Sequence, residues 1–127
     1  MDLITIWTDG IDKMKAFYKD IMGFEILVDY GEYVEFRNTG VRFAICMRRV
    51  IADADASFKE KASGQSFELA FPCDNPEDVD RTYQRLMDQG VAPVAPPEDM
   101  PWGQRTAFFK DPDGNIHELF AELSKKA

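Results

Sequence analysis

Histidine and cysteine are scarce in this sequence, which has one histidine and two cysteines among its 127 residues. Cys46 and Cys73 do not form a C-x-x-C pair, so we expect two free buried thiols rather than a disulfide or a zinc site. The single His117 does not supply a credible Ser-His-Asp or Cys-His arrangement, and no glycine-rich phosphate loop is present. Nucleophilic catalysis and phosphate binding through these motifs are therefore disfavoured.

Long hydrophobic runs are also missing. No stretch approaches the roughly 18 consecutive apolar residues that a membrane-spanning helix needs. The first residues, MDLITIW, begin directly with an apolar, strand-like run that no basic segment precedes. We therefore expect no signal peptide, a cytoplasmic location and no membrane partner.

Basic residues are outnumbered, because 15 lysines and arginines face 23 aspartates and glutamates, for a formal charge of −8. This charge repels phosphate backbones, and Arg48-Arg49 is too short a basic patch to overcome it, so no nucleic-acid partner is expected. Acidity suits a cationic ligand, although acidic proteins are often acidic only for solubility. The content of 45% hydrophobic and 30% charged residues is that of one compact globular domain at this length.

The first half of the chain predicts the order β-α-β-β-β. Residues 3–8 are β-branched and aromatic and predict a strand. Apolar residues at three- and four-residue spacing over 11–22 predict a helix, with Asp9 offering a capping oxygen and Gly23 ending it. Three more strands are predicted, over residues 24–30, 33–37 and 41–47.

The second half repeats this order after a linker, residues 48–64, in which a short helical turn is expected. Residues 67–73 predict a strand. A helix follows, for which Asp74 and Asn75 offer caps and Pro76 suits the first turn. The last three predicted strands are residues 91–95, 104–110 and 116–122, and the proline-rich segment 95–103 joins the first two of these.

A shift of 65 positions aligns the two halves. It places Asp9 on Asp74, Tyr18 on Tyr83, Ile21 on Leu86 and Met22 on Met87, and it places Leu3 on Glu68. Four matches within one element, with matching flanks, favour an internal duplication.

Two motifs resemble those of a known superfamily. The run AFYKDIMGF, residues 16–24, resembles the "FY-x-x-x-hydrophobic-GF" helix end of the glyoxalase, bleomycin-resistance and extradiol-dioxygenase superfamily, the vicinal oxygen chelate proteins. The run DPDGNIHEL, residues 111–119, resembles its "DPDGN-hydrophobic-x-E" hairpin, and PWGQR, residues 101–105, resembles a segment that precedes this hairpin in many bacterial members.

The resemblance implies an α+β fold in which two tandem βαβββ modules form an incomplete, cupped β-barrel around a ligand or metal. It predicts a single domain over residues 1–127, with module one at 1–47, the linker at 48–64 and module two at 65–127. A homodimer is expected, with the modules sometimes exchanged between subunits.

The resemblance also implies four metal-ligand positions, two for each module. They fall on Leu3 and Ala44 in the first module and on Glu68 and Glu118 in the second. Histidine occupies none of them, and because neighbours on a strand point to opposite faces, His117 is expected to point away from Glu118 as a solvent or packing residue.

Glu68 and Glu118 are thus the candidate metal ligands, and they suit a hard divalent cation better than zinc or catalytic iron. We expect no cofactor, with one divalent metal ion as the alternative. A register shift of one residue would replace Leu3 by Asp2, but that shift breaks the ungapped match to residues 17–18.

A ligand-binding interpretation uses the same carboxylates. Thr5 and Trp7 share the alternation of the first ligand position, and Trp102 lies on the loop that enters the last hairpin, at a natural rim position. Aromatic faces with Glu68 and Glu118 suit a cationic, partly aromatic small molecule.

Each of these residues also has a purely structural interpretation. Trp7 suits the core, and Trp102 suits a role in locking its loop. Glu68 and Glu118 would be satisfied by structural arginines such as Arg42 or Arg105. Arg105 is accordingly a candidate both as a ligand contact and as an ion-pair partner.

The sequence therefore predicts a metal-independent, small-molecule binding protein of the bleomycin-resistance type. The alternative is a divalent-metal-dependent lyase or isomerase of the glyoxalase I (lactoylglutathione lyase) type, in which the two carboxylates would move protons. A regulatory or structural dimer without a ligand is the third possibility.

Overall fold

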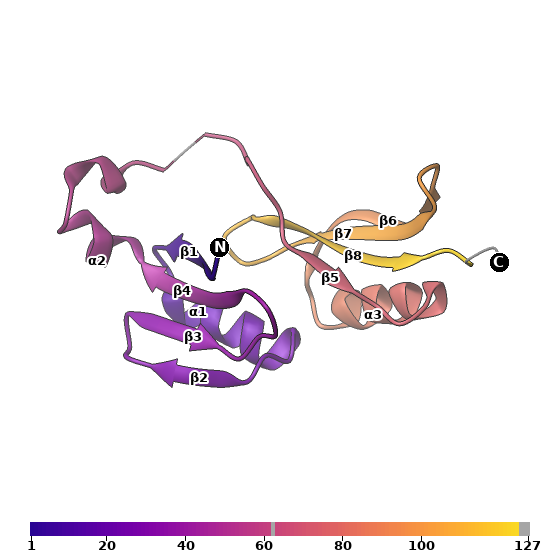
Figure 1. The fold of residues 1–127 in the computed structure, drawn as a ribbon, viewed down its shortest axis with the longest axis horizontal. Helices are drawn as coiled ribbons and strands as arrows, with labels where there is room; N and C mark the ends of the chain where they lie inside the picture. Colours follow the sequence, from indigo (N-terminus) through magenta and orange to yellow (C-terminus); the bar gives the residue numbers. More distant parts are fainter. Residues whose placement is uncertain (62, 125–127) are drawn as a thin grey trace. The chain divides into compact units, whose positions relative to one another are not determined.

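In the computed structural model, which describes residues 1–61 and 63–124, the chain forms two compact units. The N-terminal unit is residues 1–63 and the C-terminal unit is residues 64–127. Each unit holds one open four-stranded sheet whose strands and main helix follow the order β-α-β-β-β (Figure 1). The predicted α+β class and the two tandem βαβββ modules are confirmed.

The N-terminal sheet has the strand order β1-β4-β3-β2. Its elements are β1 (Leu3–Thr8), α1 (Ile11–Ala16) continuing into the π-helical turn η1 (Phe17–Ile21), β2 (Ile26–Asp29), β3 (Tyr33–Phe36) and β4 (Arg42–Met47). β1 and β4 are parallel, and the other two pairings are antiparallel. The parallel pair requires the helical crossover that α1 and η1 provide.

Aromatic side chains fill the core between this sheet and its helix. Tyr18 is fully buried, and its ring centroid lies 5.0 Å from that of Phe43, which stacks on Phe36 at 5.4 Å. Met14 and Phe17 are buried beside them. The apolar stripe predicted for residues 11–22 is therefore the core of this unit.

The predicted cap of the first helix is wrong. Gly10, not Asp9, occupies the N-cap position, and its N–H donates to the Thr8 hydroxyl at 3.0 Å. Asp9 instead pairs with Arg48 at 3.7 Å and with Lys61 at 3.0 Å. The helix begins one residue later than a cap at Asp9 requires, so that carboxylate is left to bind two cations.

Two short helices follow β4. They are α2 (Arg48–Ala52) and the 3-10 turn η2 (Ala56–Lys59), where Asp55 accepts a hydrogen bond from the Ser57 N–H. Phe58 of η2 packs edge-on against Trp7, with the ring centroids 6.1 Å apart. This segment thus covers part of the N-terminal unit.

The C-terminal sheet has the equivalent strand order, β5-β8-β7-β6. Its elements are β5 (Ala70–Pro72), α3 (Pro76–Asp88), β6 (Ala92–Met100), β7 (Gln104–Lys110) and β8 (Ile116–Glu122). Asn75 caps α3 by accepting from the Asp78 N–H at 2.9 Å, and Pro76 begins the helix, as the sequence predicts. Val79 and Leu86 of α3 are fully buried, and α3 lies along the strands of this sheet (Figure 1).

Two strand boundaries differ from the sequence prediction by three or more residues. β5 begins at Ala70 rather than at residue 67, because a side chain takes over the hydrogen bonds of that stretch, as described below. β6 runs to Met100, through the proline-rich segment that was expected to be a loop. β6 is the edge strand, so its prolines do not remove interior ladder bonds, and register shifts after Pro93 and Ala95 accommodate them.

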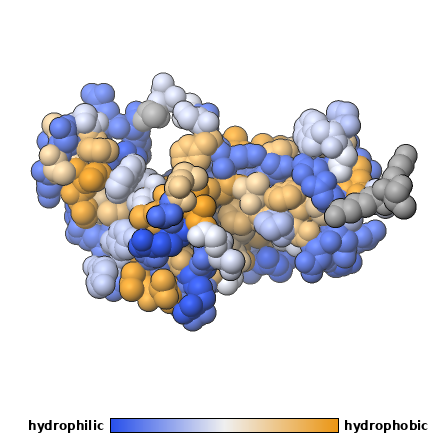
Figure 2. Space-filling model, viewed as in Figure 1, coloured by the Kyte–Doolittle hydropathy of each residue, from blue (hydrophilic) through white to orange (hydrophobic). Residues whose placement is uncertain are grey.

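The surface of each unit mixes hydrophilic and hydrophobic residues in the view of Figure 2. The large hydrophobic residues with the most exposure, apart from the N-terminal Met1, are Tyr30 at 77%, Trp102 at 64% and Phe67 at 63%. Among the helices that the structure describes, none is long and apolar enough to cross a membrane.

Candidate functional site

The side chains of Glu68 and Glu118 meet on the C-terminal sheet. Ala70 of β5 lies opposite Glu118 of β8, and Glu68, two residues earlier, points to the same face. The Glu118 N–H donates to the Leu69 carbonyl at 3.0 Å, which holds the two strands together at this point. The Glu68 carboxyl lies close enough to the Glu118 carboxyl to change its acidity.

This contact changes the acidity of Glu118. Partial burial, the hydrogen bond that protonated Glu118 donates to Glu68 and the like charge of Glu68 together raise the pKa of Glu118 to about 7. The protonated form of Glu118 is therefore populated at neutral pH. The carboxyl pair can accept a cation in exchange for a proton, or move a proton at the Glu118 carboxyl.

Gln65 fixes the segment that carries Glu68. Its Nε2 donates to the Ile116 carbonyl at 2.7 Å, and its Oε1 accepts from the Ile116 N–H at 2.7 Å. The same Nε2 donates to the Phe67 carbonyl at 2.9 Å. The side chain thus replaces a backbone strand partner for β8, which explains why regular pairing starts only at Ala70.

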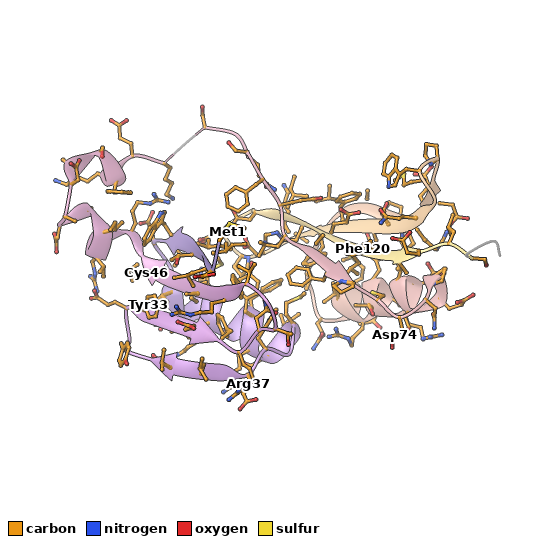
Figure 3. All side chains as sticks on the ribbon, in the orientation of Figure 1. Met1, Tyr33, Arg37, Cys46, Asp74 and Phe120 are labelled. Carbon is orange, nitrogen blue, oxygen red and sulfur yellow. The ribbon has the colours of Figure 1, made fainter. Side chains whose placement is uncertain are left out.

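Two phenylalanines flank the carboxyl pair. Phe108 of β7 lies directly opposite Glu118, and Phe120, labelled in Figure 3, lies two residues further along β8, opposite Thr106. Both rings are half-buried. Neither packs against another aromatic ring within residues 1–61 and 63–124. The aromatic surround expected from tryptophans is therefore built from phenylalanines in this unit.

His117 lies on the opposite face of the sheet and is buried. Its Nδ1 accepts a hydrogen bond from the Leu69 N–H at 3.2 Å, and its Nε2 lies 3.4 Å from an Asp111 carboxylate oxygen. Its ring packs edge-on against Phe71 and Phe109. The alternation along β8 thus makes it a packing histidine.

Arg105 also lies on that opposite face. Its Nε donates to Asp80 of α3 at 2.8 Å, and its Nη1 donates to Asp99 of β6 at 2.9 Å. Both bonds raise the pKa of the guanidinium. The structure therefore brings Glu68 together with Glu118, and it places Arg105 with two other carboxylates.

The equivalent positions of the N-terminal sheet are apolar. Thr5 pairs with Ala44 just as Ala70 pairs with Glu118, so Leu3, rather than Asp2, shares the face of Ala44. Thr5 and Trp7 share that face, and Trp7 is half-buried against Phe58.

A buried ion pair stands beside Ala44. Glu35 of β3 lies opposite Ala44, and its side chain is only 6% exposed. The Arg42 Nε and Nη2 donate to its two oxygens at 2.9 and 2.8 Å, and the Tyr33 hydroxyl donates at 2.9 Å. The bonds from Arg42, and secondly from Tyr33, lower the pKa of Glu35 to about 2. Arg42 is therefore committed to Glu35.

Trp102 lies on the turn between β6 and β7. It is 64% exposed, and its indole Nε1 donates to the Gln104 side chain at 3.0 Å. The hydrogen bond orients the ring, while most of its surface remains open to solvent.

The family model of the Glyoxalase/Bleomycin resistance protein/Dioxygenase superfamily matches residues 1–119. The chain belongs to this superfamily. It is 32% identical over 126 residues to the Bacillus subtilis (strain 168) protein named "Uncharacterized protein YraH", covering 94% of this chain and 96% of that one.

Solved structures of superfamily members have the same fold. A glyoxalase/bleomycin resistance protein/dioxygenase from Nocardioides is 25% identical, with a TM-score of 0.84 over 98% of this chain and 84% of the other. A lactoylglutathione lyase from Agrobacterium tumefaciens is also 25% identical, with a TM-score of 0.77 over 95% of this chain and 92% of the other.

The superfamily's metal site does not fit the residues of this member. Two of the four implied positions are Leu3 and Ala44, which offer no ligand atoms, and the other two are carboxyls that interact with each other. No three His, Cys, Asp or Glu side chains gather to hold a metal ion in the part of the chain that the structure describes. Two carboxylates fall short of the three or four protein ligands typical of zinc sites.

Sequence reasoning missed Phe108, Thr106 and the Glu35–Arg42 pair. The DPDGN turn sets the register between strands 104–110 and 116–122, and that register places Phe108 and Thr106 on the face of Glu118. The sequence therefore contained the information needed to find these two residues. The ion pair carries no comparable signal, because charged residues on a predicted strand are usually solvated.

Proposed function

We propose that this protein binds a cationic, partly aromatic small molecule on the sheet face that carries Glu68 and Glu118, without a metal. The observation that carries the proposal is the interacting carboxyl pair next to Phe108 and Phe120, two rings that pack on no other aromatic ring among the described residues. A bound cation replaces the proton that the pair shares. An aromatic ligand body packs on the two phenylalanines.

The interaction energies expected at this site favour an organic cation over a neutral ligand. Each contact between a cation and an aromatic face contributes about 0.5–2 kcal/mol, with the larger values at desolvated sites. Charge-assisted hydrogen bonds to carboxylates are roughly twice as strong as neutral ones. The formal charge of −8 attracts such ligands over a longer range.

Sequestration of a basic aromatic drug by a cytoplasmic homodimer is the biological role that fits this chemistry. Such a protein lowers the free concentration of the drug without changing it. Light scattering of the purified protein, with and without drug, tests the dimer, since a monomeric mass at micromolar concentration contradicts it.

Calorimetric titration with benzamidine and with neutral benzamide tests the binding itself. The two molecules have nearly the same shape, so charge recognition predicts at least about 10-fold tighter binding of benzamidine. Glu68→Gln and Glu118→Gln remove the charge and are expected to abolish this preference. Glu122→Gln, on the same face of β8 but exposed, is the matched control. Equal binding of both molecules, or of neither, contradicts the proposal.

A metal-dependent lyase is the alternative, favoured by the likeness to a lactoylglutathione lyase and by a carboxyl that titrates near neutrality. Elemental analysis of the protein purified without chelators, combined with a lactoylglutathione lyase assay, separates the two. Stoichiometric nickel or zinc with turnover that EDTA abolishes would establish the lyase and overturn the binding-only proposal.

A further inference from the structure

Thr106 carries a buried hydroxyl that has no hydrogen-bond partner. Its side chain is fully buried, and its Oγ1 makes no hydrogen bond to any residue in the described ranges 1–61 and 63–124. Buried hydroxyls are nearly always paired, because leaving water without a new partner is costly. Valine has the same shape without this cost, so the threonine weakens the fold unless something else binds its hydroxyl.

The hydroxyl lies on the face of the carboxyl pair. On β7, the alternate residues Arg105 and Phe109 point to the α3 side, where Arg105 reaches Asp80. Thr106 points to the other side, as Phe108 does. It lies opposite Phe120 on β8 and opposite Glu98 on β6.

This placement sets the spacing between Thr106 and Glu118. Because Phe108 is directly opposite Glu118, Thr106 is the diagonal neighbour of Glu118 across the β7–β8 pair. Diagonal neighbours in an antiparallel pair are about 7–8 Å apart. That distance suits one small ligand that contacts the carboxyl with one polar group and the hydroxyl with another.

We propose that the Thr106 hydroxyl is a ligand-binding group that accepts a hydrogen bond from an N–H of the ligand whose cationic end contacts Glu68 and Glu118. The inference rests on the proposed function and names its ligand class, which is amines and amidines with N–H donors rather than quaternary ammonium ions. Among the neighbouring polar groups on this face, Glu98 and Glu118 are acceptors when ionised and favour donors on the ligand, whereas the Gln104 amide donates to Glu122. Since Thr106 is fully buried in the structure, the side chains that cover it must move aside when the ligand enters.

If the Thr106 hydroxyl binds the ligand, removing it should raise the stability of the free protein and weaken its binding of benzamidine. Thr106→Val removes an unpaired buried hydroxyl, so the melting temperature of the free protein is expected to rise by about 2–5 °C. The same substitution is expected to weaken benzamidine binding about 10-fold. Thr106→Ser keeps the hydroxyl and is expected to bind benzamidine as the unmodified protein does, although its melting temperature falls through the lost methyl group.

The test is calorimetric titration of the unmodified protein, Thr106→Val and Thr106→Ser with benzamidine and with phenyltrimethylammonium, alongside thermal melts. Phenyltrimethylammonium has the charge and the ring but no N–H, so Thr106→Val should leave its weaker binding unchanged. If the unmodified protein binds both cations and Thr106→Val binds benzamidine equally well, the role of Thr106 is disproved while the proposed function stands. If the unmodified protein binds neither, the proposed function fails and this inference fails with it. If Thr106→Val has a lower melting temperature and loses affinity equally for both cations, the hydroxyl has a structural role, and this result also overturns the inference.

Discussion

The Arg42 guanidinium holds the Glu35 carboxylate with two hydrogen bonds, at 2.9 and 2.8 Å, on the face of the N-terminal sheet where Ala44 stands. Glu35 is 6% exposed and Arg42 is 56% exposed. Arg42 therefore neutralises the charge of Glu35 within this sheet. Ala44, on the strand next to Glu35, is the position that Glu118 occupies in the C-terminal unit. Tyr33 and Cys46 extend the same face on neighbouring strands (Figure 3).

Replacing Arg42 by methionine is expected to destabilise the protein clearly. The substitution keeps most of the side-chain volume but leaves a buried carboxylate with the Tyr33 hydroxyl as its remaining bonded side chain. We expect the melting temperature at pH 7 to fall by about 4–8 °C. Arg37→Met is the matched control, because its ion pair with Glu25 is 62% and 68% exposed and such pairs contribute little. Equal effects of the two substitutions would contradict this account.

The same ion pair gives a defined pH dependence. The pKa of Glu35 is lowered from 4.5 to about 2 in the folded protein, so the unfolded chain binds the proton more tightly. The contribution of the pair is fully present above pH 4.5 and is lost as the pH falls toward 2. The difference in stability between the unmodified protein and Arg42→Met, measured by urea unfolding, should therefore shrink over this range.

Glu118 should make the free energy of unfolding depend on pH in the opposite direction. Its pKa is raised from 4.5 to about 7, so the folded protein binds the proton more tightly than the unfolded chain does. The free energy of unfolding therefore decreases as the pH rises from 4.5 to 7. Glu118→Gln cannot ionise and should remove this part of the slope, whereas the exposed Glu122→Gln should keep it. Urea unfolding at several pH values measures the slope, and identical slopes for the unmodified protein and Glu118→Gln would contradict the shift.

Gln65 is expected to control the acidity of Glu118 without touching it. Gln65→Ala removes the three hydrogen bonds that tie Gln65, three residues before Glu68, to Ile116 of β8 and to Phe67. The Glu68 carboxyl then moves more freely, and the pKa of Glu118 should fall toward its ordinary value. Carbon-13 NMR titration of the glutamate carboxyls measures this change. Gln84→Ala is the matched control, since Gln84 bonds only Asp88 on the exposed side of α3.

The sequence predicted best those elements in which alternation and turn chemistry agree. Strands 3–8, 104–110 and 116–122 have their predicted bounds, because the first is rich in β-branched and aromatic residues and the last two flank the DPDGN turn. The resemblance to the superfamily implied that Glu68 and Glu118 share one site. Their interaction and the raised pKa of Glu118 could not be predicted, because they depend on where Gln65 places an irregular segment.

The failures have local physical causes. The edge position of β6, which lets its prolines lie in a strand, is a property of the sheet order and not of the sequence around residues 92–100. Asp9 does not cap the first helix, because that helix begins at Ile11 and Gly10 occupies the N-cap position. The partner of Arg105 was misjudged because α3 brings Asp80 under the sheet from a distant part of the chain.

Asp111 is expected to set the register on which the candidate site depends. Its buried carboxylate accepts from the backbone N–H groups of Asp113 and Asn115 at 3.0 and 2.9 Å, and from the Asn115 side chain at 2.8 Å. Its backbone N–H also donates to the Asn115 carbonyl at 2.9 Å, which closes the turn directly before the Lys110–Ile116 pair.

Asp111→Ala leaves these donors without their acceptor, so the free energy of unfolding should fall by about 1–3 kcal/mol. A slip of one residue between β7 and β8 would move Phe108 away from Glu118 and turn one set of side chains to the wrong face. Benzamidine binding should therefore weaken together with stability. Asp113→Ala removes an exposed carboxylate from the same turn and is the control, because the Asp113 contact in the turn uses its backbone N–H. Full benzamidine affinity in Asp111→Ala at a temperature where it is folded would show that the turn does not position the site.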